Sequence, residues 1–81
     1  MSRVLTIVER HVPDAGRAAY LTGVESRRKQ AAANHAHFWV FEHDDEPGRF
    51  VEFTEGGAAS DIAAVHDGVL PAPLWRAVQG D

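Results

Sequence analysis

Two aromatic-rich runs on either side of a short acidic turn constrain the fold more than any other feature of the sequence. Residues 37–43 and 49–55 are rich in aromatic and β-branched side chains, which favour strands. Between them lies Asp-Asp-Glu-Pro-Gly, and a Pro-Gly pair in this position is a strong hairpin signal. A turn centred on Glu46 places Trp39 opposite Phe53. The sequence therefore predicts an antiparallel hairpin with a defined register.

The same register divides the side chains of the hairpin between two faces, because successive residues of a strand point in opposite directions. One face carries His37, Trp39, Phe41, His43, Arg49, Val51, Phe53 and Glu55. The other face carries Phe38, Val40, Glu42, Phe50, Glu52 and Thr54. Each face holds large apolar side chains, so we expect both faces to be covered.

The residues before the hairpin predict a strand and then a long helix. The run over residues 3–12 is mostly apolar and β-branched, and Pro13 ends it. Residues 15–33 are rich in Ala, Arg, Lys and Gln, which are good helix formers. Asp14 is the expected N-cap of this helix.

The residues after the hairpin predict a short helix and a short last strand. The helix is expected over residues 58–66, with Ser60 as a cap near its start and Gly68 just beyond its end. Residues 74–78 fit an edge strand or a helical turn, and we favour the strand. The fold class is therefore α+β, a ferredoxin-like βαββαβ domain over residues 1–81, with an antiparallel sheet and helices on one face.

Two helices can shelter only one face of such a sheet. The chain has 81 residues and no cysteine, so no disulfide reinforces this small domain. Three aromatic side chains represent roughly 450–750 Å² of surface, and monomers rarely expose apolar patches beyond about 300–600 Å². We therefore expect a two-fold symmetric homodimer joined through the sheet face.

The charge and the hydropathy exclude several classes of partner. A net charge of −4 argues against nucleic acid, because proteins that bind it usually present a basic face. The basic run Arg27-Arg28-Lys29 is interpreted as a solvated helix end in preference to an anion contact. No apolar stretch approaches the roughly 20 residues that span a bilayer, and the first residues lack the apolar core of a signal peptide. We expect a cytoplasmic protein with no membrane partner.

Residues 4–66 resemble the dimeric α/β-barrel superfamily, in particular its antibiotic-biosynthesis-monooxygenase-like (ABM-like) members. The resemblance rests on the opening strand that ends Val12-Pro13-Asp14, the long helix, the aromatic hairpin and the short helix that ends Val65-His66. It implies a ferredoxin-like subunit whose sheet packs on the sheet of a second subunit, with a pocket between sheet and helices. Some members of the family oxidise aromatic polyketides without a cofactor, and others bind and degrade haem.

This resemblance suggests a cofactor-free monooxygenase acting on a small aromatic substrate. Such a reaction needs a base to form a substrate carbanion, and a histidine with a pKa near the working pH can serve. His37 and His66 are the candidate catalytic residues, and Tyr20, Trp39 and Phe41 are the candidate ligand-binding residues. Core packing explains the aromatic residues equally well. The alternative is a non-catalytic dimeric module that binds a small apolar or aromatic ligand or only assembles.

Metal and haem are weaker alternatives, and we expect neither. His35 and His37 have the spacing of metal ligands on a strand, but polar histidines at the start of a strand explain them as simply. Trp39 and His66 resemble a strand tryptophan and a helical histidine of the haem-degrading branch, although the first strand lacks that branch's pocket asparagine. No cofactor and no metal site are predicted.

Overall fold

The order of elements follows from the alternation of strand and helix patterns along the chain. The computed structural model describes residues 3–71 and 73–78. Its elements are β1 (Val4–His11), the 3₁₀ turn η1 (Asp14–Gly16), α1 (Arg17–Ala33), β2 (His37–Glu42), β3 (Arg49–Gly56), α2 (Ala59–Val65) and β4 (Leu74–Arg76). The strands form an antiparallel sheet in the order β2-β3-β1-β4. The predicted α+β, ferredoxin-like fold is confirmed.

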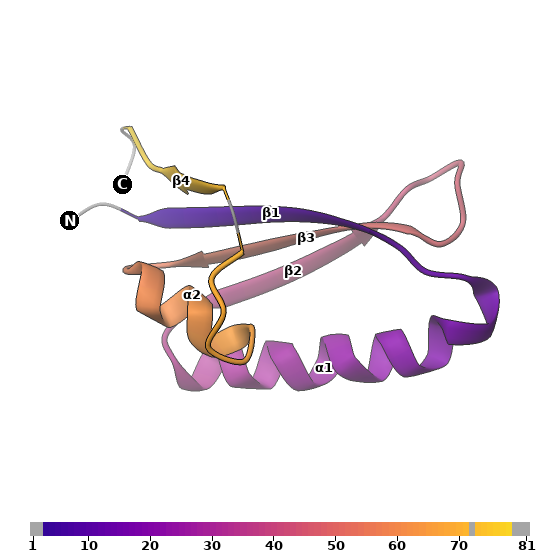
Figure 1. Ribbon diagram of the computed structural model, residues 1–81, viewed down its shortest axis with the longest axis horizontal. Helices are drawn as coiled ribbons and strands as arrows, with labels where there is room; N and C mark the ends of the chain where they lie inside the picture. Colours follow the sequence, from indigo (N-terminus) through magenta and orange to yellow (C-terminus); the bar gives the residue numbers. More distant parts are fainter. Residues whose placement is uncertain (1–2, 72, 79–81) are drawn as a thin grey trace.

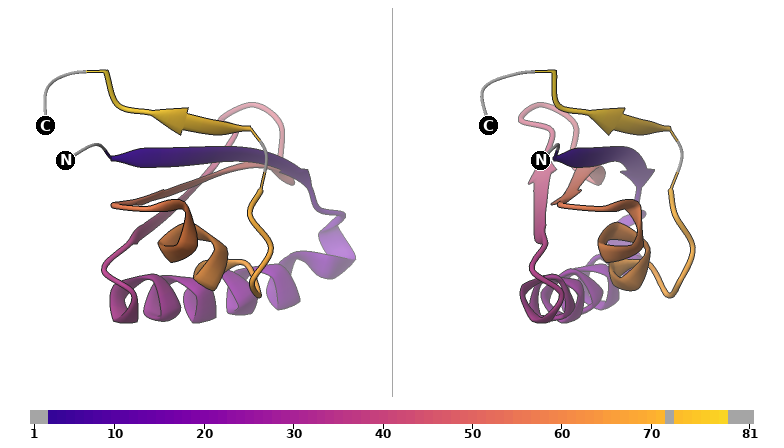
Figure 2. Two further views of the ribbon diagram at one scale, coloured as in Figure 1. Left: turned by 60° about the vertical axis from the view of Figure 1, so that its left-hand side comes forward. Right: turned by 90° about the vertical axis from the view of Figure 1, so that its left-hand side faces the viewer.

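The two helices lie on the same face of the sheet. Figure 1 shows α1 running along the whole sheet with α2 beside it, and the turned views of Figure 2 show no helix on the opposite face. We call the side that meets the helices the helix face and the opposite side the outer face. Within residues 3–71 and 73–78, no helix is long and apolar enough to cross a membrane.

The hairpin adopts the predicted register. Trp39 pairs with Phe53, and Phe41 pairs with Val51. Burial in β3 alternates residue by residue, which is the pattern of a strand with one covered face. Gly48 closes the turn with φ +88°, and its carbonyl accepts a 2.8 Å hydrogen bond from the Val12 amide. The turn is thus tied to the end of β1.

The layer between sheet and helices is partly apolar and partly polar. Its buried apolar side chains are Ala31, Ala36, Phe38, Phe50, Ile62 and Val65. Its buried polar side chains are Thr6, Glu52, Thr54 and His66. The expectation that the helix face is covered as an apolar surface is therefore met only in part, and the polar residues within it form the candidate site.

The predicted caps of both helices are wrong, although the helices themselves are present. Asp14 belongs to the 3₁₀ turn before α1, and its side chain caps neither that turn nor the helix. The chain tightens there through a hydrogen bond from the Gly16 amide to the Pro13 carbonyl. Ser60 lies inside α2, whose N-cap is Ala58.

The C-terminal signals are confirmed. Gly68 follows α2 with φ +83°, and its amide donates to the carbonyl of Ala63 at 2.8 Å. The last element is a strand, as favoured, and is three residues long. It pairs with β1, so that Trp75 lies opposite Leu5.

Two glycines provide a matched test of the hairpin turn. A Cβ at Gly48 would lie 2.5 Å from the Val12 carbonyl oxygen, at a positive φ that alanine rarely adopts. Gly48→Ala should therefore lower the free energy of unfolding by at least about 1 kcal/mol. A Cβ at Gly23, within α1, would meet nothing within 4 Å beyond its chain neighbours and the backbone of its own helix. Gly23→Ala should leave stability unchanged or raise it by up to about 1 kcal/mol. Urea denaturation of both variants measures the difference, and equal effects would contradict the turn geometry.

Candidate functional site

The five side chains singled out from the sequence lie on two different faces of the sheet. His37, Trp39 and Phe41 are alternate residues of β2, and all three are exposed on the outer face. Tyr20 projects from α1, and His66 follows α2, so both belong to the helix face. One subunit therefore does not bring the five together in a single pocket, because the sheet separates them.

A buried carboxylate organises the helix face. The side chain of Glu52 is 0% exposed. The hydroxyl of Tyr20 donates a 2.6 Å hydrogen bond to its Oε2. Arg10 places Nε 3.5 Å from Oε1, and Arg27 places a terminal guanidinium nitrogen 3.6 Å from Oε2. We call Tyr20, Glu52, Arg10 and Arg27 the Glu52 cluster.

Secondary structure explains why these four residues meet. Arg10 and Glu52 are at even positions of the paired strands β1 and β3, whose even residues face the helices. Tyr20 and Arg27 are seven residues apart on α1, close to two full turns, so they lie on one side of that helix. The helix thus presents a hydroxyl and a guanidinium to the same carboxylate.

The cluster compensates the burial of Glu52 with a hydroxyl donor and two positive charges. Burial raises the pKa of Tyr20 well above its ordinary value, and the hydrogen bond to Glu52 raises it further. Tyr20 therefore stays protonated and continues to donate. Oε1 of Glu52 has no hydrogen-bond partner among the described residues.

His66 is the second buried titratable group of the helix face. Its Nε2 lies 2.8 Å from Oγ1 of Thr54, and the ring of Phe38 packs against it with the ring centres 5.9 Å apart. Burial lowers the pKa of His66, and the positive charge of Arg27 lowers it further. The imidazole is therefore neutral near pH 7.

The two arginines of the Glu52 cluster and His66 line one cleft. This cleft has a volume of about 240 Å³ and is lined by Arg10, Arg27, His66, Asp67, Val69 and Pro71. It lies between β1, α1 and the loop after α2, and it opens to solvent. Of the residues predicted from the sequence, His66 lines it directly, whereas Tyr20 reaches it through Glu52.

Sequence reasoning missed Arg10, Glu52 and Thr54 as parts of this site. The available signal was Glu52 itself, a charged residue that the hairpin pattern places on the same face as Phe38 and Phe50. The interpretation of the basic run as a helix end is wrong, because α1 continues to Ala33 and its last turn holds no basic residue. Arg27 lies within α1 and turns toward Glu52, whereas Arg28 pairs with Glu25 at the surface.

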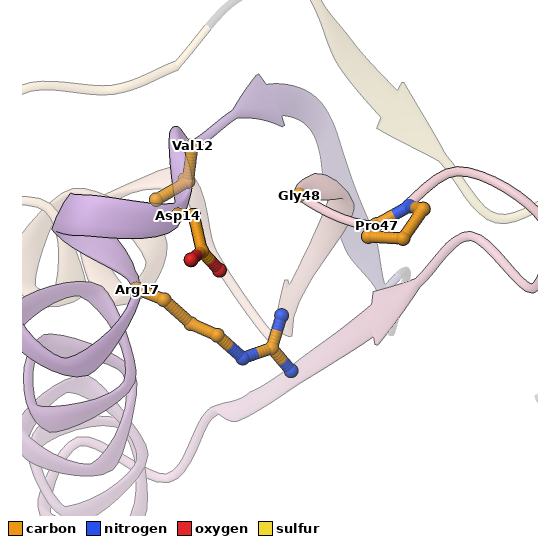
Figure 3. Close-up of a pocket in the computed structure, with 5 residues that line it drawn as sticks. All are labelled: Val12, Asp14, Arg17, Pro47 and Gly48. Atoms are coloured by element: carbon orange, nitrogen blue, oxygen red, sulfur yellow. The ribbon is translucent and has the colours of Figure 1, made fainter.

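A smaller cavity at the hairpin end of the sheet is structural. Its volume is about 70 Å³, and Figure 3 shows Arg17 extending into it from the start of α1. The cavity is lined by Val12, Asp14, Arg17, Pro47 and Gly48. Arg17 donates to both carboxylate oxygens of Glu42, at 2.6 and 2.8 Å. These bonds, with one from the Gly48 amide, lower the pKa of Glu42 to about 2. The guanidinium is thus already engaged.

The outer face is an apolar surface to which all four strands contribute. Its apolar side chains are Leu5, Ile7, Trp39, Phe41, Val51, Phe53 and Trp75. Trp39, Phe41 and Trp75 are 47%, 58% and 55% exposed. The ring of His37 stacks on Trp39, with centres 5.3 Å apart. Nothing in residues 3–71 and 73–78 covers this surface.

The positions of the candidate metal and haem ligands can be compared with what such sites require. Within the two described ranges, no three His, Cys, Asp or Glu side chains come together as a metal site would require. Trp39 and His66 face opposite sides of the sheet, so one subunit does not place them around a common haem pocket. The haem-degrading arrangement does not fit this geometry.

The chain thus has a ferredoxin-like sheet with both helices on one face and an apolar surface on the other. One solved structure with this fold is described as "Putative antibiotic biosynthesis monooxygenase from Nitrosomonas europaea". It superposes with a TM-score of 0.66 at 18% sequence identity, over 99% of this chain and 89% of that chain. No family model matches the sequence, and neither does any curated protein. The ABM-like resemblance seen in the sequence is therefore confirmed at the level of the fold.

The burial of His66 predicts a pH-dependent stability. An unfolded chain protonates this residue near pH 6.5, whereas burial and Arg27 keep the folded pKa lower. Between the two pKa values the unfolded state binds more protons, so the free energy of unfolding should fall as the pH drops below about 6.5. The negative charges of Glu52 and Asp67 raise the pKa of His66 and so oppose its lowering, whereas the positive charge of Arg10 lowers it further.

Urea denaturation at about pH 7.5 and about pH 5.5, at one protein concentration, measures this dependence. His66→Gln should weaken it, because glutamine takes up no proton. His11→Gln, at an exposed position of β1, is the control and should leave it intact. An identical pH dependence in wild type and His66→Gln would contradict the assignment.

Proposed function

We propose that the protein is a homodimeric ABM-like barrel whose helix-face cleft binds and oxidises a small molecule without a cofactor. The dimer is supported by the outer face. Three aromatic residues that are about half exposed leave on the order of 300 Å² of apolar surface in water, given about 150–250 Å² for each side chain. That area already equals the largest patch on many monomers. Leu5, Ile7, Val51 and Phe53 enlarge it.

A second copy of the chain is the occupant that suits this surface. A two-fold axis would set one apolar sheet face against an identical face, so each subunit would supply what the other needs. The ion pairs of Arg3 with Glu55 and of Glu9 with Arg49 border the apolar area. They form the polar rim that protein interfaces usually have. In this proposal His37, Trp39 and Phe41 act in assembly.

A charge on the outer face tests the dimer. Trp39→Glu would place a carboxylate within the apolar contact, and it should convert the protein to a single chain of 8.9 kDa. Leu21→Glu is the matched control, because Leu21 is 43% exposed on α1, away from the outer face. This variant should keep the mass of two chains. Light scattering coupled to gel filtration at micromolar concentration gives both masses, and a single-chain mass for the wild type would refute the dimer.

The chemistry is supported by one observation, namely a neutral buried histidine that lines the cleft. When Nε2–H of His66 donates to Thr54, Nδ1 keeps a lone pair that can accept a proton. Removal of a proton from an activated methylene leaves a carbanion that can reduce O₂. One oxygen atom then becomes the product carbonyl, and the other leaves as water with the two hydrogens. The reaction of the methylene with O₂ to give a carbonyl and water needs no external reductant, in line with the expectation of no cofactor.

The two candidate bases differ in their surroundings. His66 is buried, held by Thr54 and open to the cleft on one side. His37 is exposed on the outer face and stacks on Trp39. We therefore assign the role of base to His66 and place His37 in the proposed dimer contact.

Oxygen uptake with anthrone as substrate tests the activity. His66→Gln should lower the rate at saturating substrate at least about 100-fold, because a general base contributes about 10²–10⁴. His11→Gln should retain the wild-type rate. Uptake that is equal in the wild type and His66→Gln would contradict the role of His66.

The non-catalytic module is the second candidate, and the lining of the cleft favours it. Among the residues that the structure describes, the cleft is lined by two arginines, a histidine, an aspartate, a valine and a proline, so no Phe, Tyr or Trp ring forms a wall for a planar substrate. A small-molecule binding protein needs only this lining and no base. Absence of oxygen uptake with anthrone- and quinol-type substrates, together with ligand binding in the cleft, would favour this second function.

A further inference from the structure

The guanidinium groups of Arg10 and Arg27 are only partly engaged by Glu52. Each has one nitrogen at 3.5–3.6 Å from a carboxylate oxygen, which is at or beyond the limit of a hydrogen bond. Within residues 3–71 and 73–78 neither group donates a hydrogen bond to any side chain or carbonyl. A guanidinium presents several N–H donors in a planar fork, so most of those of Arg10 and Arg27 remain available.

Glu52 carries the carboxylate that both guanidinium groups approach. Its carboxylate is completely buried and is fixed by the short hydrogen bond from Tyr20. The two arginines approach it from different elements, β1 and α1, and both also line the cleft. The buried carboxylate of Glu52 therefore attracts both guanidinium groups to the cleft. This arrangement contrasts with Arg17, whose donors are used by both oxygens of Glu42.

The charges and side chains around the cleft indicate which ligand charge and shape would fit it. The two arginines contribute two positive charges, and Glu52 and Asp67 contribute two negative charges. A ligand with one negative charge adds less repulsion to this balance than a dianionic phosphate ester. A carboxylate is planar and matches the guanidinium fork. Val69 and Pro71 supply an apolar wall on the same cleft.

We propose that the cleft binds a small monocarboxylate, whose carboxylate group lies on Arg10 and Arg27 and whose apolar body lies against Val69 and Pro71. The proposal deepens the proposed function, because it names the substrate or ligand class of the same cleft. His66, which lines the same cleft, then lies beside the ligand. Tyr20 and Glu52 act as positioning residues, since they reach the ligand only through the arginines.

Benzoate and benzamide are the probes, because they have nearly the same shape and differ in charge. Titration of each into nitrogen-15-labelled protein, followed by two-dimensional NMR, should give saturable shifts with benzoate that map to residues around Arg10, Arg27 and His66. Benzamide should bind at least about tenfold more weakly, because it lacks the charge that the guanidinium forks recognise. Equal binding of the two probes would overturn the proposal, as would benzoate shifts confined to the outer face or no shifts at millimolar benzoate.

Arginine variants identify the group that holds the carboxylate. Arg27→Gln and Arg10→Gln should each weaken benzoate binding about tenfold or more. Arg28→Gln is the matched control, because Arg28 is the next residue of α1 and pairs with Glu25 at the surface. An equal loss in Arg28→Gln would mean general charge attraction and would overturn the site. The same spectra report whether each variant is folded, and the wild-type comparison of the two probes decides the question if a variant is not.

The outcomes separate this proposal from the proposed function. Benzoate binding without any oxygen uptake would leave the carboxylate site standing and favour the non-catalytic module. Oxygen uptake that depends on His66, without benzoate binding, would leave the oxygenase standing and refute the carboxylate site.

Discussion

The structure depends on the alternation of side chains along a four-stranded sheet for which the chain supplies only two helices. The helices cover one face, and the strands then place their largest aromatic residues on the other. Trp39, Phe53 and Ile7 follow one another across three neighbouring strands, and Trp75 extends the same surface on β4. Because side-chain direction has a period of two, a slip of one residue would exchange these groups with Phe38 and Glu52. The register therefore determines both the apolar outer face and the candidate site.

The interior explains why the outer face matters for stability. The buried apolar set on the helix side includes two alanines and only four larger side chains. Part of the same layer is occupied by a carboxylate, two threonines and a histidine. Buried charge contributes little net stability even when it is well compensated. A domain of 81 residues with such an interior is expected to be marginal alone, so burial of the outer face would stabilise it substantially. The polar residues of the interior and the apolar residues of the outer face therefore belong to one arrangement, in which the interior alone supplies little stability.

The hairpin was predictable because its signals are local. The Pro-Gly turn and the alternation on either side of it set the register of Trp39 with Phe53 before any tertiary contact is considered. The caps were less predictable, since Asp14 and Ser60 are good cap residues that the backbone did not use. The positions of Asp14 and Ser60 relative to the helix starts depend on how η1 and the Gly56-Gly57 segment connect each helix to the sheet, and this connection depends on tertiary packing.

The site was only partly predictable for a related reason. Tyr20 and Trp39 both look like pocket aromatics in the sequence, but which face of the sheet meets the helices is decided by the packing of the whole domain. Arg27 looks like one member of a solvated basic run, and its turn toward Glu52 appears only when α1 is laid against β3. Glu52, a charged residue on the same strand face as Phe38 and Phe50, is the one local signal of the cluster in the sequence.

The tryptophans allow a direct test of the central claim, that the outer face is buried against a second copy. The sequence has two tryptophans, and both lie on this face. At micromolar concentration their emission should be blue-shifted and protected from acrylamide, and dilution should shift it to the red in a concentration-dependent transition. Emission typical of tryptophan in water at every concentration, from protein whose circular dichroism shows it folded, would contradict the account.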